Sequence, residues 1–187
     1  MRIIVISSKQ KIDSEGLHVP LNTEGFKDAD NLCTNKILDS TIVGKIDAIY
    51  SAPSICCLQT IYPYCITQGI KVCIENAFYK KLTPEYFNYN NFRYNIEDIK
   101  NHFKYLTNII DCNYKSSIST SNISFCDNEN DFNNRITPFL YSLVKNSKNN
   151  EKTYIINTHK CVSDKIKNIL TNKYNKKFYA NLKIHYL

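Results

Sequence analysis

The feature that most constrains this chain is an alternation of short β-branched runs with longer amphipathic segments. Three runs in the first half are predicted strands, at residues 2–6, 47–51 and 71–75. The segments between them, 23–38 and 54–68, have the apolar spacing of helices. Strands that alternate with helices pair in parallel, so the chain is expected to have an α/β fold with a mainly parallel sheet.

The second half continues this alternation with longer polar interruptions. Residues 80–95 and 112–130 are rich in Asn and are predicted loops. An amphipathic helix is predicted over 96–110, with Ile96, Ile99, Phe103, Leu106 and Ile110 on one side. The remaining predictions are a helix near 129–147 interrupted or kinked by Pro138, a strand at 153–157, a helix at 161–174 and a strand at 178–186.

The predicted helix over 23–38 shows its pattern clearly enough to name its buried face and its cap. Thr23 is a candidate N-cap, because a side-chain oxygen there can accept a hydrogen bond from the first turn. The apolar face comprises Phe26, Ala29, Leu32, Cys33, Ile37 and Leu38. We expect all six side chains to face the sheet.

Length and composition indicate one ordinary globular domain over residues 1–187. Hydrophobic residues make up 43% and charged residues 22% of the 187 residues, and there are only 4 Gly. The apolar runs are too short to cross a bilayer, and residues 1–10 lack the apolar region of a secretory signal. We therefore expect a cytoplasmic location, with the nucleus as an open alternative, and no membrane partner.

The net charge of +7 comes almost entirely from Lys, since Arg occurs only at positions 2, 93 and 135. Nucleic-acid surfaces generally use Arg, whose guanidinium grips phosphate at two points. The Lys residues are spread along the chain, which disfavours nucleic acid as a partner.

The 8 Cys residues show no spacing typical of a metal site, because neither a CxxC nor a CxxH pair occurs. Without a secretory signal, free and mostly buried thiols are expected rather than disulfides. The sequence therefore predicts no metal and no cofactor.

Several motifs, taken in order, resemble those of the histidine phosphatase superfamily, also called phosphoglycerate mutase-like. Residues 46–60, IDAIYSAPSICCLQT, resemble its YSSPxxRxxQT motif most closely. VISSKQ stands at the first-strand site, PLNTEGFKDA (20–29) at a helix start, and YIINTHK (154–160) at a late strand that ends in His. The resemblance implies a three-layer α/β/α sandwich with a mainly parallel central sheet.

Three further stretches resemble the eukaryotic branch that contains the suppressor-of-T-cell-receptor-signalling phosphatases. ENAFYK (75–80) is similar to its E-x-G-L-F-E pattern, and IIDCNY (109–114) resembles its id-x-x-Y. NDFNNRITPFL (130–140) resembles a helix that carries an Arg. The resemblance therefore covers nearly the whole chain.

The residues that the family's reaction needs are mostly replaced. The resemblance implies a nucleophilic His at the end of the first strand, two Arg and a second His that hold the phosphoryl oxygens, and an acid. Ser8 stands at the nucleophile position, Ser7 and Cys56 at the two Arg positions, and Lys80 at the acid position. Only His159 is retained. The chain is therefore expected to be a catalytically inactive pseudophosphatase that binds a protein or an anionic phosphorylated ligand.

Alternatives remain open at the same positions. Residual or repurposed phosphohydrolase (phosphomonoesterase) activity would centre on His159, a serine hydrolase would pair Ser8 with His159, and a thiolate pair would join Cys56 to His159. Phosphate, sulfate or a phosphorylated ligand could be held by a group of cations at the old phosphate site: Lys9, Lys80, His159 and Lys160. A protein partner could instead bind the aromatic loop 86–95. The sequence does not determine the oligomeric state.

Overall fold

The computed structural model of the chain describes residues 1–8, 19–34, 38, 45–81, 99, 101, 103–123, 128–146, 152–173 and 183–186. The candidate anion ligand Lys9, the aromatic loop 86–95 and Ile37 of the predicted first helix lie outside these residues.

A five-stranded parallel sheet forms the centre of the molecule, with the strand order β3-β2-β4-β1-β5. Its strands are β1 (Arg2–Ser7), β2 (Ala48–Ser51), β3 (Val72–Ile74), β4 (Thr153–Thr158) and β5 (Lys183–Tyr186). Every pairing between them is parallel. The parallel sheet and its five strands confirm the predicted α/β class.

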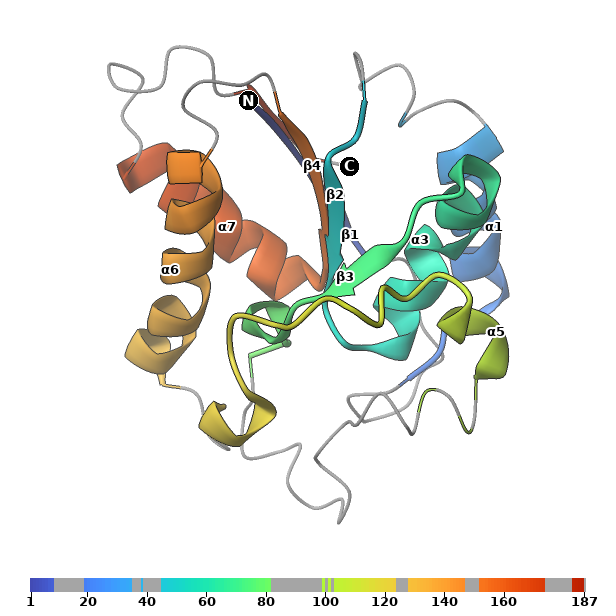
Figure 1. The fold of residues 1–187 in the computed structure, drawn as a ribbon, viewed down its shortest axis with the longest axis horizontal. Coiled ribbons are helices and arrows are strands. Elements are labelled where there is room, and N and C mark those ends of the chain that lie inside the picture. The colour runs from blue at the N-terminus through green and yellow to red at the C-terminus, as the bar shows by residue number, and fades with distance from the viewer. Residues whose placement is uncertain are drawn as a thin grey trace.

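Helices cover both faces of this sheet, as Figure 1 shows. On one side lie α1 (Thr23–Thr34), α3 (Ile55–Gln68) and α5 (Lys104–Thr107), and on the other lie α6 (Glu129–Asn146) and α7 (Lys160–Lys173). Successive β1 side chains alternate between the two cores: Ile4 and Ile6 pack toward the α3 side, and Ile3 and Val5 toward the α6 side. The predicted three-layer sandwich is therefore confirmed.

Helix α3 has clear local signals at both of its ends. Ser54, in extended backbone, precedes its first residue. At the other end Gly69 adopts a φ of 64°, a left-handed conformation that glycine enters without steric cost. The backbone N–H of Ile70 then donates to the carbonyl of Cys65 over 3.1 Å and closes the last turn. The Ser54 side chain makes no capping hydrogen bond, so the clearer local signal is the one at Gly69, where α3 ends.

The first helix differs from its prediction in two respects. Its N-cap is Asn22 rather than Thr23, because the Oδ1 atom of Asn22 accepts from the backbone N–H of Gly25 over 2.8 Å. Phe26 is 42% exposed instead of facing the sheet, whereas Ala29 and Leu32 are buried as expected. Gly25 is buried in the same turn as Phe26, so the buried face is rotated relative to the predicted one.

Two later predictions also need correction. The chain is no longer helical at Ile110, which instead bridges to Val72 beside β3, so the helix predicted to reach residue 110 ends early. Helix α6 runs through Pro138 without interruption, so of the two predicted alternatives, an interruption or a kink, the interruption is wrong. Its buried face, which includes Ile136, Phe139 and Leu140, packs on the core, and tertiary packing outweighs the hydrogen bond that proline cannot donate.

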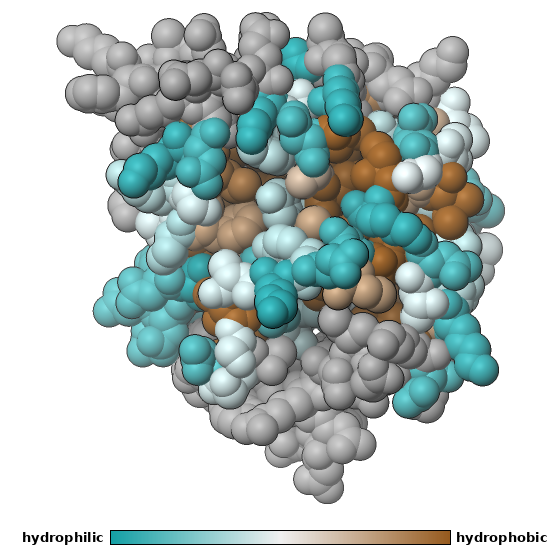
Figure 2. All heavy atoms as spheres, in the orientation of Figure 1, coloured by the Kyte–Doolittle hydropathy of each residue, from teal (hydrophilic) through white to brown (hydrophobic). Residues whose placement is uncertain are grey.

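Figure 2 shows many hydrophilic residues over the coloured part of one face of the molecule. Hydrophobic residues show on both sides of the middle of this face. In the described part of the chain, large exposed hydrophobic residues are few: Phe26, Ile66, Tyr105 and Tyr141. None of the helices found there is long and apolar enough to cross a bilayer.

Candidate functional site

The candidate site lies where the neighbouring strands β1 and β4 end. Ser7 and Thr158 are paired at the last position of the two strands. The backbone N–H of Ser8 donates to the carbonyl of Thr158 over 2.7 Å and so extends the pairing by one residue. The adjacency of the two strands, which the resemblance requires, is therefore confirmed.

His159 joins the end of β4 to the start of α7. Its carbonyl accepts from the backbone N–H groups of Val162 and Ser163, at 3.0 and 2.9 Å, so it stands as the residue that opens the helix. Its side chain is only 5% exposed. The backbone around His159 is therefore held on both sides by regular structure.

The first turn of α3 faces this strand end and is tied to it by Asn157. The backbone N–H of Ala52 donates to the Asn157 carbonyl over 2.9 Å. The Asn157 side-chain amide donates to the Cys57 carbonyl over 2.5 Å and to the Ser51 hydroxyl over 3.2 Å. Asn157 is fully buried, so these bonds are shielded from water.

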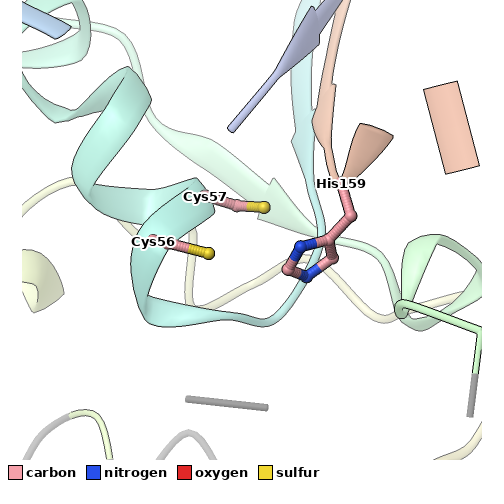
Figure 3. A group of neighbouring side chains, drawn as sticks. All are labelled: Cys56, Cys57 and His159. Atoms are coloured by element: carbon pink, nitrogen blue, oxygen red, sulfur yellow. The ribbon is translucent and has the colours of Figure 1, made fainter. Parts of the chain in front are cut away.

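Two cysteines and one histidine meet between these elements. One ligand atom from each of Cys56, Cys57 and His159 lies within 4.8 Å of the others. Figure 3 shows both sulfur atoms on the first turn of α3 directed toward the imidazole. Both cysteines are fully buried. We call these three residues the CCH cluster.

The two thiols of the CCH cluster differ in acidity. A hydrogen bond from Cys57, with His159 and Ser54 as further contributors, lowers the pKa of the Cys56 thiol far below its usual value. Burial, and then the neighbouring Cys56, raises the pKa of the Cys57 thiol well above its usual value. The Ser54 hydroxyl lies 3.6 Å from the Cys56 sulfur. The start of α3 also favours negative charge at this end of the helix.

A second polar group, around Glu75, borders the end of β3. The Glu75 carboxylate is fully buried and accepts five hydrogen bonds, from the backbone of Ala77 and Ser117 and from the hydroxyls of Tyr114, Ser116 and Ser117. These bonds join the 75–79 turn to the 112–119 segment. Because both of its oxygens accept hydrogen bonds, the Glu75 side chain has a structural role here.

Arg135 on α6 holds the same turn from its other side. Its Nη1 atom donates to the carbonyls of Ala77 and Tyr79, at 3.1 and 2.9 Å. The guanidinium carbon lies 5.2 Å from the centre of the Phe132 ring, within the range of a cation–π contact. The 75–79 turn also contacts the candidate site, because the Thr158 hydroxyl donates to the Phe78 carbonyl over 3.0 Å.

The structure brings together some of the residues singled out from the sequence. Cys56 lies against His159, and the Ser8 hydroxyl interacts with Cys57. Ser7, at the end of β1, is half-buried. Lys80 is half-buried after the 75–79 turn. Lys160 is on the surface, where its side chain is 84% exposed and lies 3.9 Å from the Asp164 carboxylate.

Sequence reasoning missed Cys57, Asn157 and the Glu75 network. The metal-site spacings sought in the sequence lie within one short segment, whereas the CCH cluster combines adjacent residues with a His from a different strand end. The one available signal was that Cys57 adjoins a position already singled out. A first helical turn can direct two neighbouring side chains toward the same strand end, but this becomes visible only when the strands are paired.

Several solved structures have a fold similar to that of this chain. An ecdysone phosphate phosphatase from Bombix mori matches with a TM-score of 0.63 and 16% identity, over 85% of this chain and 59% of that chain. A putative alpha-ribazole-5'-P phosphatase from Escherichia coli matches with a TM-score of 0.57 and 13% identity, over 90% of this chain and 79% of that chain. A mycobacterial glucosyl-3-phosphoglycerate phosphatase matches with a TM-score of 0.55 and 12% identity, over 89% of this chain and 76% of that chain.

These matches show that the chain has a phosphoglycerate mutase-like fold. It spans about three fifths of the Bombix mori enzyme. No protein-family model matches the sequence. No curated protein matches it either.

Proposed function

We propose that this chain is a catalytically inactive member of the histidine phosphatase superfamily that acts by binding rather than by turnover. The proposal rests on which side chains stand at the ends of β1 and β4. The residue after β1 is Ser8, and the side chain beside His159 is the Cys56 thiol. Membership of the eukaryotic branch is part of the same proposal and rests on the motifs at 75–80, 109–114 and 130–140.

Neither of the two Arg residues that the structure describes supplies the missing guanidinium. Arg2 begins β1, and a strand of its length separates it by roughly 16–20 Å from the end where Ser8 lies. Arg135 is buried, and its Nη1 atom is bonded to two backbone carbonyls. Moving it to a phosphate would leave those carbonyls unsatisfied.

The expected loss of activity is large enough to decide between turnover and binding. Removal of a nucleophile lowers turnover by about a million-fold. Removal of one donor that stabilises transition-state charge costs about 10²–10³ in rate. Such losses are not additive, but the first alone removes hydrolysis through a phosphohistidine.

An anionic, phosphorylated ligand is the partner that the site supports best. The N-terminal ends of α3 and α7 both lie at the edge of the sheet where Ser8 and His159 stand, and helix N-termini favour anions. Lys160 adds an exposed cation at the start of α7. Lys80 and Lys9 remain proposed contributors from the sequence.

Two measurements test the proposal. The purified chain should hydrolyse p-nitrophenyl phosphate no faster than buffer and should gain no phosphoryl mass at residue 8 or 159. Phosphate or sulfate should raise its melting temperature, and this rise should be lost in Lys160→Glu and His159→Ala but kept in Lys145→Glu, a change in the last turn of α6 away from the site. An unchanged melting temperature at any phosphate concentration would remove the anion-binding part and leave a protein partner as the ligand.

Residual phosphohydrolase activity centred on His159 is the competing candidate. The observation in its favour is the Cys56 thiol of lowered pKa beside His159, since a thiolate is a nucleophile. Turnover that disappears in His159→Ala or Cys56→Ala, with folding preserved, would establish this candidate and overturn the inactive assignment.

A further inference from the structure

The CCH cluster has the donor set of a metal site, and this property goes beyond phosphate binding. Its donors are two sulfurs and one imidazole nitrogen, a combination that suits thiophilic ions rather than Mg²⁺ or Ca²⁺. All three side chains are buried, so an ion held between them would be shielded from water. Thiols are weak donors and acceptors, so they satisfy a buried imidazole poorly by themselves.

We propose that Cys56, Cys57 and His159 bind one Zn²⁺ ion in a three-residue site with its fourth position open. Zinc–sulfur and zinc–nitrogen bonds of about 2.3 and 2.0 Å place tetrahedral ligands roughly 3.5–3.8 Å apart. The ligand atoms of the cluster all lie within 4.8 Å of one another, so the widest pair must close by at most about 1.3 Å. Side-chain rotation supplies such a change without moving the backbone.

Charge balance also fits the ion. Two thiolates neutralise the two positive charges of zinc, and a neutral imidazole completes a site with no net charge. Such a site can be buried without the penalty that an isolated thiolate would carry in the same place. The Ser8 hydroxyl interacts with Cys57, and an oxygen ligand commonly fills the fourth position of zinc sites that have three protein ligands.

Hydrogen bonds hold the backbone of two of the three ligands, Cys57 and His159, in place before an ion arrives. Asn157 fixes the carbonyl of Cys57 against the end of β4, and the α7 hydrogen bonds fix the backbone of His159. Contacts that orient ligands in this way support metal affinity in known sites. The proposed site therefore combines two cysteines from the first turn of α3 with one histidine from the end of β4. The helical turn and the strand end both pack at the same edge of the sheet.

The test uses the full chain, freed of metal by a chelator and titrated with Zn²⁺ or with Co²⁺ as a spectroscopic substitute. One Zn²⁺ should bind per chain and raise the melting temperature. Co²⁺ should give thiolate-to-cobalt charge-transfer absorption together with the visible bands of a tetrahedral ion. His159→Ala and Cys56→Ala should each weaken binding by more than about 100-fold, since even the loss of an outer contact costs about 10–100-fold.

Cys161→Ser is the matched control, because Cys161 lies two residues from His159 but outside the CCH cluster. It should keep the cobalt spectrum and the affinity of the unchanged chain. The proposal is overturned if the unchanged chain shows no thiolate–cobalt absorption or no zinc-dependent rise in melting temperature. It is equally overturned if Cys56→Ala and His159→Ala fold and retain the full spectrum. Phosphatase turnover would refute the proposed function without affecting these readouts.

Discussion

The side chain of Asn157 donates a hydrogen bond to the backbone carbonyl of Cys57 over 2.5 Å. One residue thus joins the end of β4 to the first turn of α3, the two elements that carry His159 and the two cysteines. This contact ties the backbone of Cys57 to the residue that lies two positions before His159.

Asn157→Ala should therefore lower stability as well as disturb the site. Two buried hydrogen bonds are lost and the Cys57 carbonyl is left without that donor, so we expect a loss of about 2 kcal/mol in the free energy of unfolding. Urea denaturation measures this loss. Asn130→Ala, at an exposed position on α6, should change stability by less than about 0.5 kcal/mol. Equal effects of the two changes would contradict the role assigned to Asn157.

Glu75→Gln should destabilise the turn that supports the site. The amide group of Gln would face backbone N–H groups that cannot reverse their direction, so at least one buried donor loses its acceptor. We expect a loss of about 2 kcal/mol, read from chemical denaturation. Glu24→Gln is the matched control, because the ion pair of Glu24 with Lys27 is exposed. A Glu75→Gln chain as stable as the unchanged one would show that the network contributes little.

Glu129 should make a small contribution to stability that depends on pH. Hydrogen bonds from Lys165 and Lys81 lower the pKa of Glu129 in the folded chain. Its contribution is therefore present above the unfolded pKa of about 4.3 and is lost as pH falls through the lower folded pKa. Because its side chain is 60% exposed, we expect less than about 1 kcal/mol.

Unfolding free energies of the unchanged chain and of Glu129→Gln measure this contribution. Their difference should shrink as pH falls into the acid range and should also shrink in high salt. If the difference in unfolding free energy grew as the pH fell, its pH dependence would be opposite to that of an ion pair. That result would refute the stabilising role of Glu129.

The cysteines outside the CCH cluster should differ in reactivity. Cys112 is exposed, whereas burial raises the pKa of the Cys65 thiol to about 12. Because the thiolate is the reactive form, a maleimide should label Cys112 rapidly and Cys65 only when the chain unfolds. Mass spectrometry of labelled peptides checks the order, with urea-unfolded chain as the reference in which both react. Labelling of Cys65 in the folded chain at the rate of Cys112 would contradict its burial.

Local chemistry along the chain was enough to predict the order of strands and helices and the class of fold. Runs such as residues 2–6 and 153–157 form strands because β-branched residues suit a sheet that is buried on both faces, and Gly69 ends a helix because it accepts positive φ. Predictions failed where a choice depended on a distant partner. Phe26 lies on the surface, and Ile110 leaves the helical path to bridge with Val72.

By itself the sequence determined the parallel α/β framework and which residues stand at positions 7, 8, 56 and 80, since hydrophobic period and residue identity need no partner to be read. Only the tertiary structure decided that Cys56, Cys57 and His159 share one buried space. The physical reason is that parallel pairing of β1, β2 and β4 places the ends of distant segments at one edge of the sheet. A helix that starts at that edge then directs its first-turn side chains toward the neighbouring strand end.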